Sequence, residues 1–275
     1  MPQAVSAVLD HLSSLPPFPK VAAKLMTLFD DPSVGASELS EVLSMDPALV
    51  MKVIHASNSP FYMLSKPVES VNQAVLVLGM KTIKTITTAS AIIQGVSQIK
   101  PRPDVFDINK FWKHSYATAI AATKISILEN NPNGNRLYLV GLIHDIGKLI
   151  IAYYWPESWK RIVNHLKTEN KTYDEVESEL FMCTNTEVTL TLCRNWKFPD
   201  YTIELIKQKL LPDGPQPEYA GEYNILRKAN VLAGLSGYPF PVENKVSKSN
   251  YDLSSYASIS KNLSKDVEHQ LKSLI

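Results

Sequence analysis

The chain has 275 residues, of which 45% are apolar and 20% charged, a composition typical of soluble globular proteins. Its 28 basic and 27 acidic side chains leave a formal net charge of +1, which gives no electrostatic footprint for nucleic acid or an anionic membrane. The N-terminus lacks a basic stretch followed by an apolar one, and polar residues interrupt every long apolar run. We therefore expect a cytoplasmic protein with neither nucleic acid nor membrane as a partner.

The first hundred residues carry apolar side chains at helical spacing, separated by turn signals. This pattern predicts a helix between Pro19 and Asp30. The pair Asp46-Pro47 is an N-cap followed by proline at the first helical position, and two later helices are expected to pivot at Gly79-Met80. The proline-rich stretch at 100–104 disfavours helix, so we place a boundary between two helical subdomains there.

The second half is also helical in period. We expect a long helix at about 107–129, then a helix that carries His144-Asp145, and then helices at 157–169, 173–183, 187–196, 201–210 and 222–235. From about 247 the chain is rich in Ser and Lys, and its end is expected to be a docked or fraying helix. Because no stretch has the alternation of a strand, the predicted fold class is all-α.

The adjacent pair His144-Asp145 stands at the end of an apolar run, thirty residues after His114. Neutral imidazole and carboxylate are ordinary ligands for a divalent metal. A carboxylate buried in such a run needs a cation or hydrogen-bond donors beside it. Neighbouring residues diverge by about 100° on a helix, so both side chains reach one ion most easily where the helix ends. Gly147 can supply that end.

His114 followed by the run from His144 to Lys148 resembles the HD superfamily of metal-dependent phosphohydrolases, and most closely its HDOD (HD-related output domain) family. Supporting motifs extend from about Leu15 to Leu210. In chain order they are Leu15–Pro19, Met45–Leu49, Ala56–Tyr62, Ser70–Val75 with Leu78-Gly79, Phe111–Ser115, Thr186–Val188 and Trp196–Pro199.

The resemblance implies an N-terminal helical bundle packed on an HD-like multi-helix core. The expected segments are 1–100 for the bundle, 101–246 for the core and 247–275 for a C-terminal helix or tail, together one HDOD-type unit. HDOD proteins are bacterial signalling modules, often joined to receiver or cyclic-dinucleotide-turnover domains. No such domain is visible in this sequence, so we expect a kinase, a receiver or a cyclic-dinucleotide enzyme to act in trans, with a nucleotide as a candidate ligand.

The resemblance also implies a metal site. His114, His144 and Asp145 match the ligands of active HD enzymes, whereas Asn230 occupies the expected place of a late aspartate. Asn230 offers a neutral carbonyl oxygen, so the site loses one negative charge and much of its metal affinity. Three ligands could still hold Fe, Mn or Zn weakly.

Two further positions depart from the family pattern. Asn185 and Lys209 stand where HDOD relatives often carry histidines that are candidates for a second metal or for phosphate contacts. Lys148 is either a phosphate or ligand contact, or a lysine that caps the C-terminal end of its helix.

We therefore predict a signal-transduction module with a degenerate metal site and no catalytic residue. The alternative is a metal-dependent phosphohydrolase acting on a nucleotide or cyclic dinucleotide. A third interpretation is a cyclic-nucleotide sensor that keeps the pocket without the chemistry.

Overall fold

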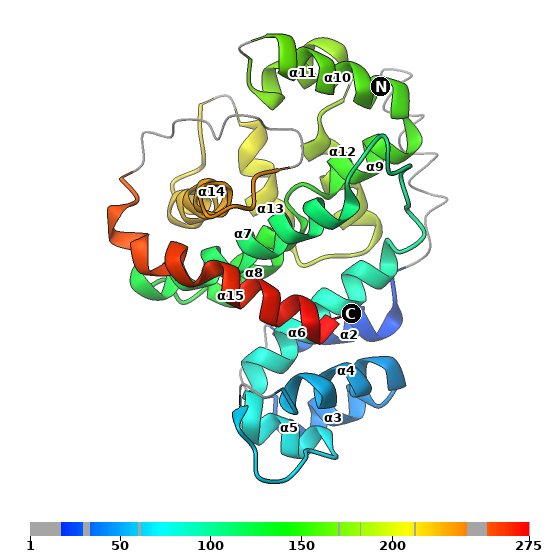
Figure 1. The fold of residues 1–275 in the computed structure, drawn as a ribbon, viewed down its shortest axis with the longest axis vertical. Coiled ribbons are helices and arrows are strands. Elements are labelled where there is room, and N and C mark those ends of the chain that lie inside the picture. Colours follow the sequence, from blue (N-terminus) through cyan, green and yellow to red (C-terminus); the bar gives the residue numbers. More distant parts are fainter. Residues whose placement is uncertain are drawn as a thin grey trace. The chain divides into compact units, whose positions relative to one another are not determined.

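The computed structural model describes residues 18–29, 34–59, 62–169, 171–181, 183–211, 213–240 and 252–274. Every regular element over these residues is a helix, which confirms the predicted all-α class (Figure 1). The described chain forms two compact units. The large unit comprises Gln98–Asn195 and Asp200–Val267, and the small unit comprises Pro16–Ser97, Trp196–Pro199 and Glu268–Ile275. The sequence-based boundaries at 100 and 246 stay a prediction.

Within the described residues, five complete helices build the small unit, and their apolar faces meet in one core. Asp46 caps the third of them by accepting hydrogen bonds from the backbone N–H groups of Ala48 and Leu49, as the Asp-Pro pair predicts. Leu39, Val53 and Ile83 are fully buried in the core. The helices are α2 (Lys20–Phe29), α3 (Ala36–Leu43), α4 (Pro47–Ser57), α5 (Val71–Leu78) and α6 (Met80–Gly95).

Two of the sequence motifs meet in the small unit, although they are far apart in the chain. The ring of Phe18 stacks on that of Trp196 at a centroid distance of 4.8 Å and lies 5.4 Å from that of Phe198. A Cβ added at Gly95 would lie 2.9 Å from the Trp196 ring, so this helix end must lack a side chain. We call Phe18, Gly95, Trp196 and Phe198 the aromatic clasp.

The pivot predicted at Gly79 is present. Gly79 has a φ of +76°, a positive value that is unfavourable for residues with a Cβ atom. It ends α5 and begins α6, and the two helices are bent by 113°. The chain can therefore turn sharply here without a loop.

The large unit is centred on α7 (Ile108–Leu128), which packs against α8 (Gly134–Ile143) and α14 (Ala220–Leu235). The next helix, α9 (Ile146–Tyr154), packs against the two helices that flank it in space. These are α10 (Pro156–Thr168) and α12 (Asn185–Asn195). The remaining elements are α11 (Tyr173–Leu180), α13 (Asp200–Lys207), η2 (Gln208–Leu210), η3 (Ser254–Tyr256) and α15 (Ala257–Leu274).

The sequence left open whether the C-terminal segment is a docked or a fraying helix. The structure shows that it is docked at least as far as Val267. Ile259, Leu263 and Val267 of α15 are buried, and Asp266 forms an ion pair with Lys124 of α7. These four contacts repeat at helical spacing, so one face of α15 covers the large unit.

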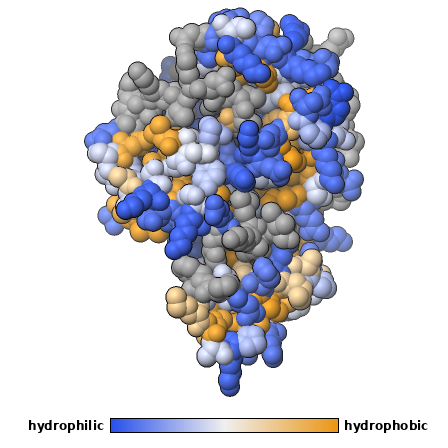
Figure 2. All heavy atoms as spheres, viewed as in Figure 1, coloured by the Kyte–Doolittle hydropathy of each residue, from blue (hydrophilic) through white to orange (hydrophobic). Residues whose placement is uncertain are grey.

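Within the described residues, the stretch Gly134–Tyr154, which contains α8 and α9, is long and apolar enough to cross a membrane, but 83% of its most apolar window is buried inside the protein. The pair α5 and α6 passes the same test only as one span bent by 113°. Figure 2 shows hydrophilic and hydrophobic side chains interspersed on the visible face. Burial of this kind is typical of the core helix of a globular domain, so the composition of Gly134–Tyr154 is weak evidence for a membrane span.

The helix that carries the His-Asp pair ends earlier than the sequence predicts. α8 ends at Ile143 and α9 begins at Ile146, so His144 and Asp145 form the break and Gly147 lies inside α9. A Cβ added at Gly147 would lie 2.0 Å from the backbone oxygen of Asn185. Gly147 therefore allows α9 to approach α12 closely. Its predicted role in ending the helix is wrong.

Candidate metal centre

The break between α8 and α9 turns His144 and Asp145 toward His114 on α7. The candidate ligand atoms of these three residues lie within 4.8 Å of one another. We call His114, His144 and Asp145 the cluster. His144 Nε2 is 3.3 Å and His114 Nε2 is 3.8 Å from Asp145 Oδ2. The side chains of His114 and Asp145 are 2% and 3% exposed, and that of His144 is 20% exposed. The structure thus brings together three of the four residues that the sequence nominates as ligands.

Hydrogen bonds orient both imidazole rings through their Nδ1 atoms. Nδ1 of His114 lies 2.8 Å from the backbone oxygen of Tyr238, and Nδ1 of His144 lies 2.8 Å from that of Gly141. A carbonyl oxygen only accepts hydrogen bonds, so each Nδ1 carries a proton, and in a neutral ring Nε2 then presents a lone pair. Within the described chain, both buried Nε2 atoms lack a hydrogen bond, and the 3.3 Å contact to Asp145 is within ion-pair distance only.

This donor set fits one divalent metal. Two neutral imidazoles and a carboxylate are common ligands of Zn²⁺ and Fe²⁺, and proteins usually orient a ligating imidazole through its other nitrogen, as both histidines are oriented in this chain. Ligand bonds of about 2.1 Å in a tetrahedral site put two ligand atoms about 3.4 Å apart. The separations of 3.3 and 3.8 Å are close to that spacing.

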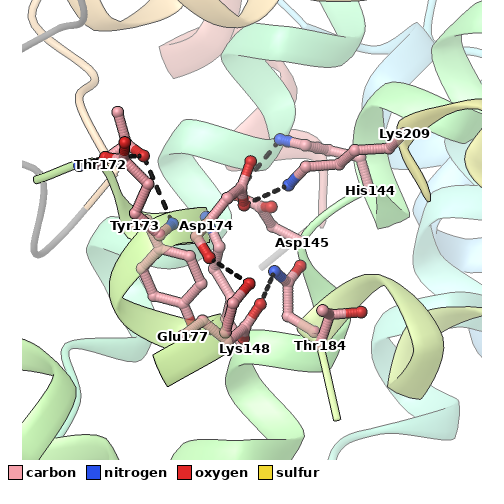
Figure 3. A network of polar contacts seen from close by, with 12 residues as sticks. His144, Asp145, Lys148, Thr172, Tyr173, Asp174, Glu177, Thr184 and Lys209 are labelled. Atoms are coloured by element: carbon pink, nitrogen blue, oxygen red, sulfur yellow. Dashed lines mark hydrogen bonds and ion pairs between the residues drawn. The ribbon is translucent and has the colours of Figure 1, made fainter. Parts of the chain in front are cut away.

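Lys148 places a positive charge beside Asp145, one of the three candidate metal ligands. Its Nζ lies 3.0 Å from Asp145 Oδ2 (Figure 3). The Nε2 atoms of both imidazoles are 3.3 and 3.8 Å from the same oxygen. The ammonium also lies 4.2 Å from the ring centroid of Tyr173 and 4.0 Å from that of Phe240, so two aromatic faces enclose it. Lys148 is buried in the first turn of α9, and the alternative of a C-terminal capping lysine is therefore wrong. Its contact with a phosphate or other ligand stays a prediction.

Burial and neighbouring charges set the ionisation of the cluster. Burial lowers the pKa of His114 to about 4, and the nearby His144 acts in the same direction, so His114 is neutral near pH 7. Burial alone would raise the pKa of Asp145, but His144 and the Lys148 ammonium outweigh it and hold that pKa well below its usual value. The buried site therefore contains an ionised carboxylate whose nearest partner is the lysine ammonium.

Comparison with known proteins decides the family. The HDOD domain pattern matches residues 15–212. The chain belongs to the HDOD domain family. The curated relative that it matches is an uncharacterized protein of Treponema pallidum, 19% identical over 235 residues. That match covers 82% of this chain and 43% of the relative, so the chain spans less than half of the relative's length.

Solved HDOD structures share the fold. An HDOD domain protein of unknown function from Geobacter sulfurreducens matches with a TM-score of 0.76 at 20% identity, covering 98% of this chain and 97% of that one. A "Putative phosphohydrolase" from Shewanella amazonensis matches with 0.72 at 24%, covering 98% of each chain. A "Putative signal transduction protein" from Marinobacter aquaeolei matches with 0.76 at 22%, covering 96% of this chain and 60% of that one. The predicted family and HD-like fold are confirmed.

A second layer of polar residues lies behind the cluster of this HDOD chain. The carboxylate of Glu177, only 1% exposed, accepts hydrogen bonds from the Tyr173 hydroxyl at 2.9 Å and the Asn185 side-chain amide at 2.8 Å. Burial raises the pKa of Glu177, and these hydrogen bonds offset only part of that rise. Asn185, at a position where the resemblance led us to expect histidine, thus positions a buried acid.

The other two departures from the HDOD pattern lie in helical segments of the large unit. Lys209 in η2 forms an ion pair with Asp174 at 3.0 Å and lies close enough to lower the pKa of Asp145 (Figure 3). Asn230 is half-buried in α14, the helix that packs along α7 and precedes the Tyr238 carbonyl. Its role as a fourth ligand stays a prediction.

Sequence reasoning missed three residues that shape the HDOD site, namely Tyr173, Glu177 and Phe240. A weak signal existed in α11, where Glu177 follows Tyr173 by one helical turn and lies on the same buried face as Val176. An acid on an apolar face indicates a buried polar contact. Phe240 follows a short loop with no periodicity, so no pattern points to it.

Proposed function

We propose that this HDOD chain is a cytoplasmic bacterial signal-transduction module that acts by binding a protein or a small ligand, without turnover. A kinase, a receiver or a cyclic-dinucleotide enzyme acting in trans is the expected partner, and a nucleotide is the candidate small ligand. Two findings support this proposal. The chain belongs to the HDOD family, and a solved protein with the same fold is named a "Putative signal transduction protein".

The observation that carries the proposal is the closure of the cluster. His114 and Asp145 are each 2% exposed, and Lys148 is 3% exposed. A hydrolytic metal needs an open coordination position that water and a phosphoryl group can reach. Of the three ligands, His144 alone has an appreciably exposed side chain. Such a site favours binding or a structural role over catalysis on a nucleotide.

The charge of the cluster supports the same conclusion. Asp145 supplies one negative charge, and Lys148 already neutralises it at 3.0 Å. A divalent Fe, Mn or Zn ion held by His114, His144, Asp145 and the predicted Asn230 would therefore be weakly bound. When bound, such an ion would polarise a phosphoryl oxygen and lower the pKa of a bound water.

The alternative function is a metal-dependent phosphohydrolase acting on a nucleotide or cyclic dinucleotide. The Nε2 atoms of His114 and His144 favour it, because within the described residues they make no hydrogen bond and are oriented as metal ligands. In this alternative, Lys148 would release Asp145 and contact a phosphate. A cyclic-nucleotide sensor would use the same pocket without the chemistry.

Hydrolysis assays separate these functions. Purified full-length protein would be incubated with Mn²⁺, or with Fe²⁺ under anaerobic conditions, and with bis(p-nitrophenyl) phosphate or a cyclic dinucleotide. His144→Gln is the matched control, because it removes one ligand at the most exposed position of the cluster. We expect the rates of wild type and variant to agree within about twofold, whereas a wild-type rate at least about tenfold higher would establish the hydrolase.

Binding is tested separately. Affinity purification of the tagged full chain from its native bacterium is expected to enrich a kinase, a receiver or a cyclic-dinucleotide enzyme. Repeated experiments that enrich none of these would contradict the signalling proposal. A melting temperature that rises with a nucleotide in wild type and not in Lys148→Met would favour the sensor.

A further inference from the structure

Three nitrogen atoms face a single oxygen in the cluster. Asp145 Oδ2 lies 3.0 Å from Lys148 Nζ, 3.3 Å from His144 Nε2 and 3.8 Å from His114 Nε2. Asp145 is buried, so its carboxylate requires a positive partner, and the Lys148 ammonium is the nearest of the three nitrogens to this oxygen.

Neighbouring side chains and backbone fix the position of the Lys148 ammonium. The rings of Tyr173 and Phe240 lie about 4 Å away and stabilise a cation over their faces. The backbone that carries Lys148 is fixed, because Gly147 brings α9 against the backbone of α12. Lys148 is thus a desolvated charge in a defined place, unlike a surface lysine that samples many rotamers.

A second carboxylate lies near this ammonium. Glu177 accepts a hydrogen bond from the Tyr173 hydroxyl, and the Tyr173 ring contacts Lys148. Burial raises the pKa of Glu177, and the nearby Lys148 charge opposes part of that rise. If Lys148 left Asp145, it would therefore have a buried acceptor in Glu177 and would not need to reach solvent.

We propose that Lys148 is an internal competitor for a divalent metal: its ammonium and an ion held by His114, His144 and Asp145 exclude each other. Both neutralise the same carboxylate oxygen, and two like charges cannot share that oxygen in a buried site. Glu177 accepts the ammonium when a metal enters. This inference goes beyond the proposed function, because it concerns metal affinity whether or not the protein turns over a substrate.

Metal titration of the full chain tests this competition. Lys148→Met removes the charge and keeps a long apolar side chain between the two rings. Isothermal titration with Mn²⁺ and with Zn²⁺ should give a dissociation constant at least about tenfold lower for Lys148→Met than for wild type. The matched control is Lys160→Met, since Lys160 lies in the next helix, has a half-exposed side chain and pairs with Glu157. Its metal affinity should equal that of wild type.

Thermal denaturation gives a second readout. Without metal, Lys148→Met should melt below wild type, because Asp145 loses its partner, and saturating Zn²⁺ should raise its melting temperature more than that of wild type. Equal or weaker metal binding by Lys148→Met would overturn the inference.

A second variant decides the question if Lys148→Met does not fold. Glu177→Gln removes the acceptor charge of the displaced ammonium, so it should bind Mn²⁺ at least about threefold more weakly than wild type. Unchanged affinity would overturn the inference. These ratios compare metal dissociation constants and do not depend on the hydrolysis rate of wild type. A negative result for the competition between Lys148 and metal can therefore be distinguished from a negative result for the proposed function.

Discussion

The carboxylate of Asp145 lies among two imidazoles and one ammonium with almost no exposure to water. The free energy of unfolding therefore depends on the cation that accompanies it. A buried ion pair adds little net stability when it is intact, but removal of one partner leaves the other charge without compensation. A substitution that removes the charge of either Asp145 or its cationic partner should therefore lower the free energy of unfolding of the large unit.

Asp145→Asn tests this dependence. The substitution keeps the shape of the side chain and leaves the Lys148 ammonium buried beside a neutral amide, so the free energy of unfolding should fall by about 3–5 kcal/mol. Urea denaturation measures the change. Asp104→Asn, which breaks the exposed pair with Arg102, should cost less than about 1 kcal/mol. A loss for Asp145→Asn as small as that of the control would contradict the buried pair.

Glu177 should make stability depend on pH. Burial raises its pKa above the usual 4.5, so the folded protein binds this proton more tightly than the unfolded chain does. The stabilising contribution is complete below pH 4.5 and is lost as the pH rises through the raised pKa.

Urea denaturation of Glu177→Gln from pH 4 upward measures this contribution. Because glutamine does not titrate, the unfolding free energy of Glu177→Gln relative to wild type should increase as the pH rises above 4.5. The exposed, non-titrating change Ile127→Ala should show a difference from wild type that is independent of pH. A flat difference for Glu177→Gln would show that its pKa is not raised.

At the residue scale, the sequence predicts the ligands and not their surroundings. His144 and Asp145 are adjacent and end an apolar run, so their pattern is local. Tyr173 and Phe240, which enclose Lys148, lie 25 and 92 residues beyond it, and only tertiary packing brings them there.

Helix ends explain which elements the sequence predicts well. Asp46 and Gly79 act through neighbouring backbone atoms, so the boundaries that they set are found where the sequence places them. The break at His144 has no such local signal, because α8 and α9 form one apolar run. Directly after the break, α9 approaches α12, a contact between segments about forty residues apart in the chain that periodicity does not describe.

Gly147→Ala tests that approach. Its Cβ would meet the backbone oxygen of Asn185 at 2.0 Å and the hydroxyl of Thr189 at 2.9 Å, so α9 must move away from α12. We expect a loss of about 3 kcal/mol in the free energy of unfolding, measured in urea. Gly221→Ala is the matched control, since nothing lies within 4 Å of its added Cβ and alanine favours helix. A neutral Gly147→Ala would contradict the close contact.

At the scale of the whole molecule, the aromatic clasp joins two distant segments of the small unit. Phe18 precedes α2 and Trp196 follows α12, yet their rings stack. Each motif is visible in the sequence, but periodicity describes only neighbours along the chain and cannot pair them. The division into a large and a small unit likewise depends on such long-range contacts.

Trp196→Ala should therefore destabilise the small unit. Trp196 is buried against Phe18 and Gly95, and loss of a buried aromatic side chain costs about 3–5 kcal/mol. Urea denaturation followed by circular dichroism measures the change. Leu76→Ala, at a position that is 86% exposed, should change stability by less than about 0.5 kcal/mol. Equal stability of the two variants would contradict the clasp.

Anomalous diffraction tests the central claim most directly, namely that Lys148 rather than a catalytic metal neutralises the cluster. Crystals of full-length protein purified without chelator or added metal would be measured at the Mn, Fe and Zn absorption edges. We predict no anomalous peak between His114, His144 and Asp145, with Lys148 Nζ within hydrogen-bond distance of Asp145. A fully occupied ion with a water in an open coordination position, and Lys148 turned away, would contradict it.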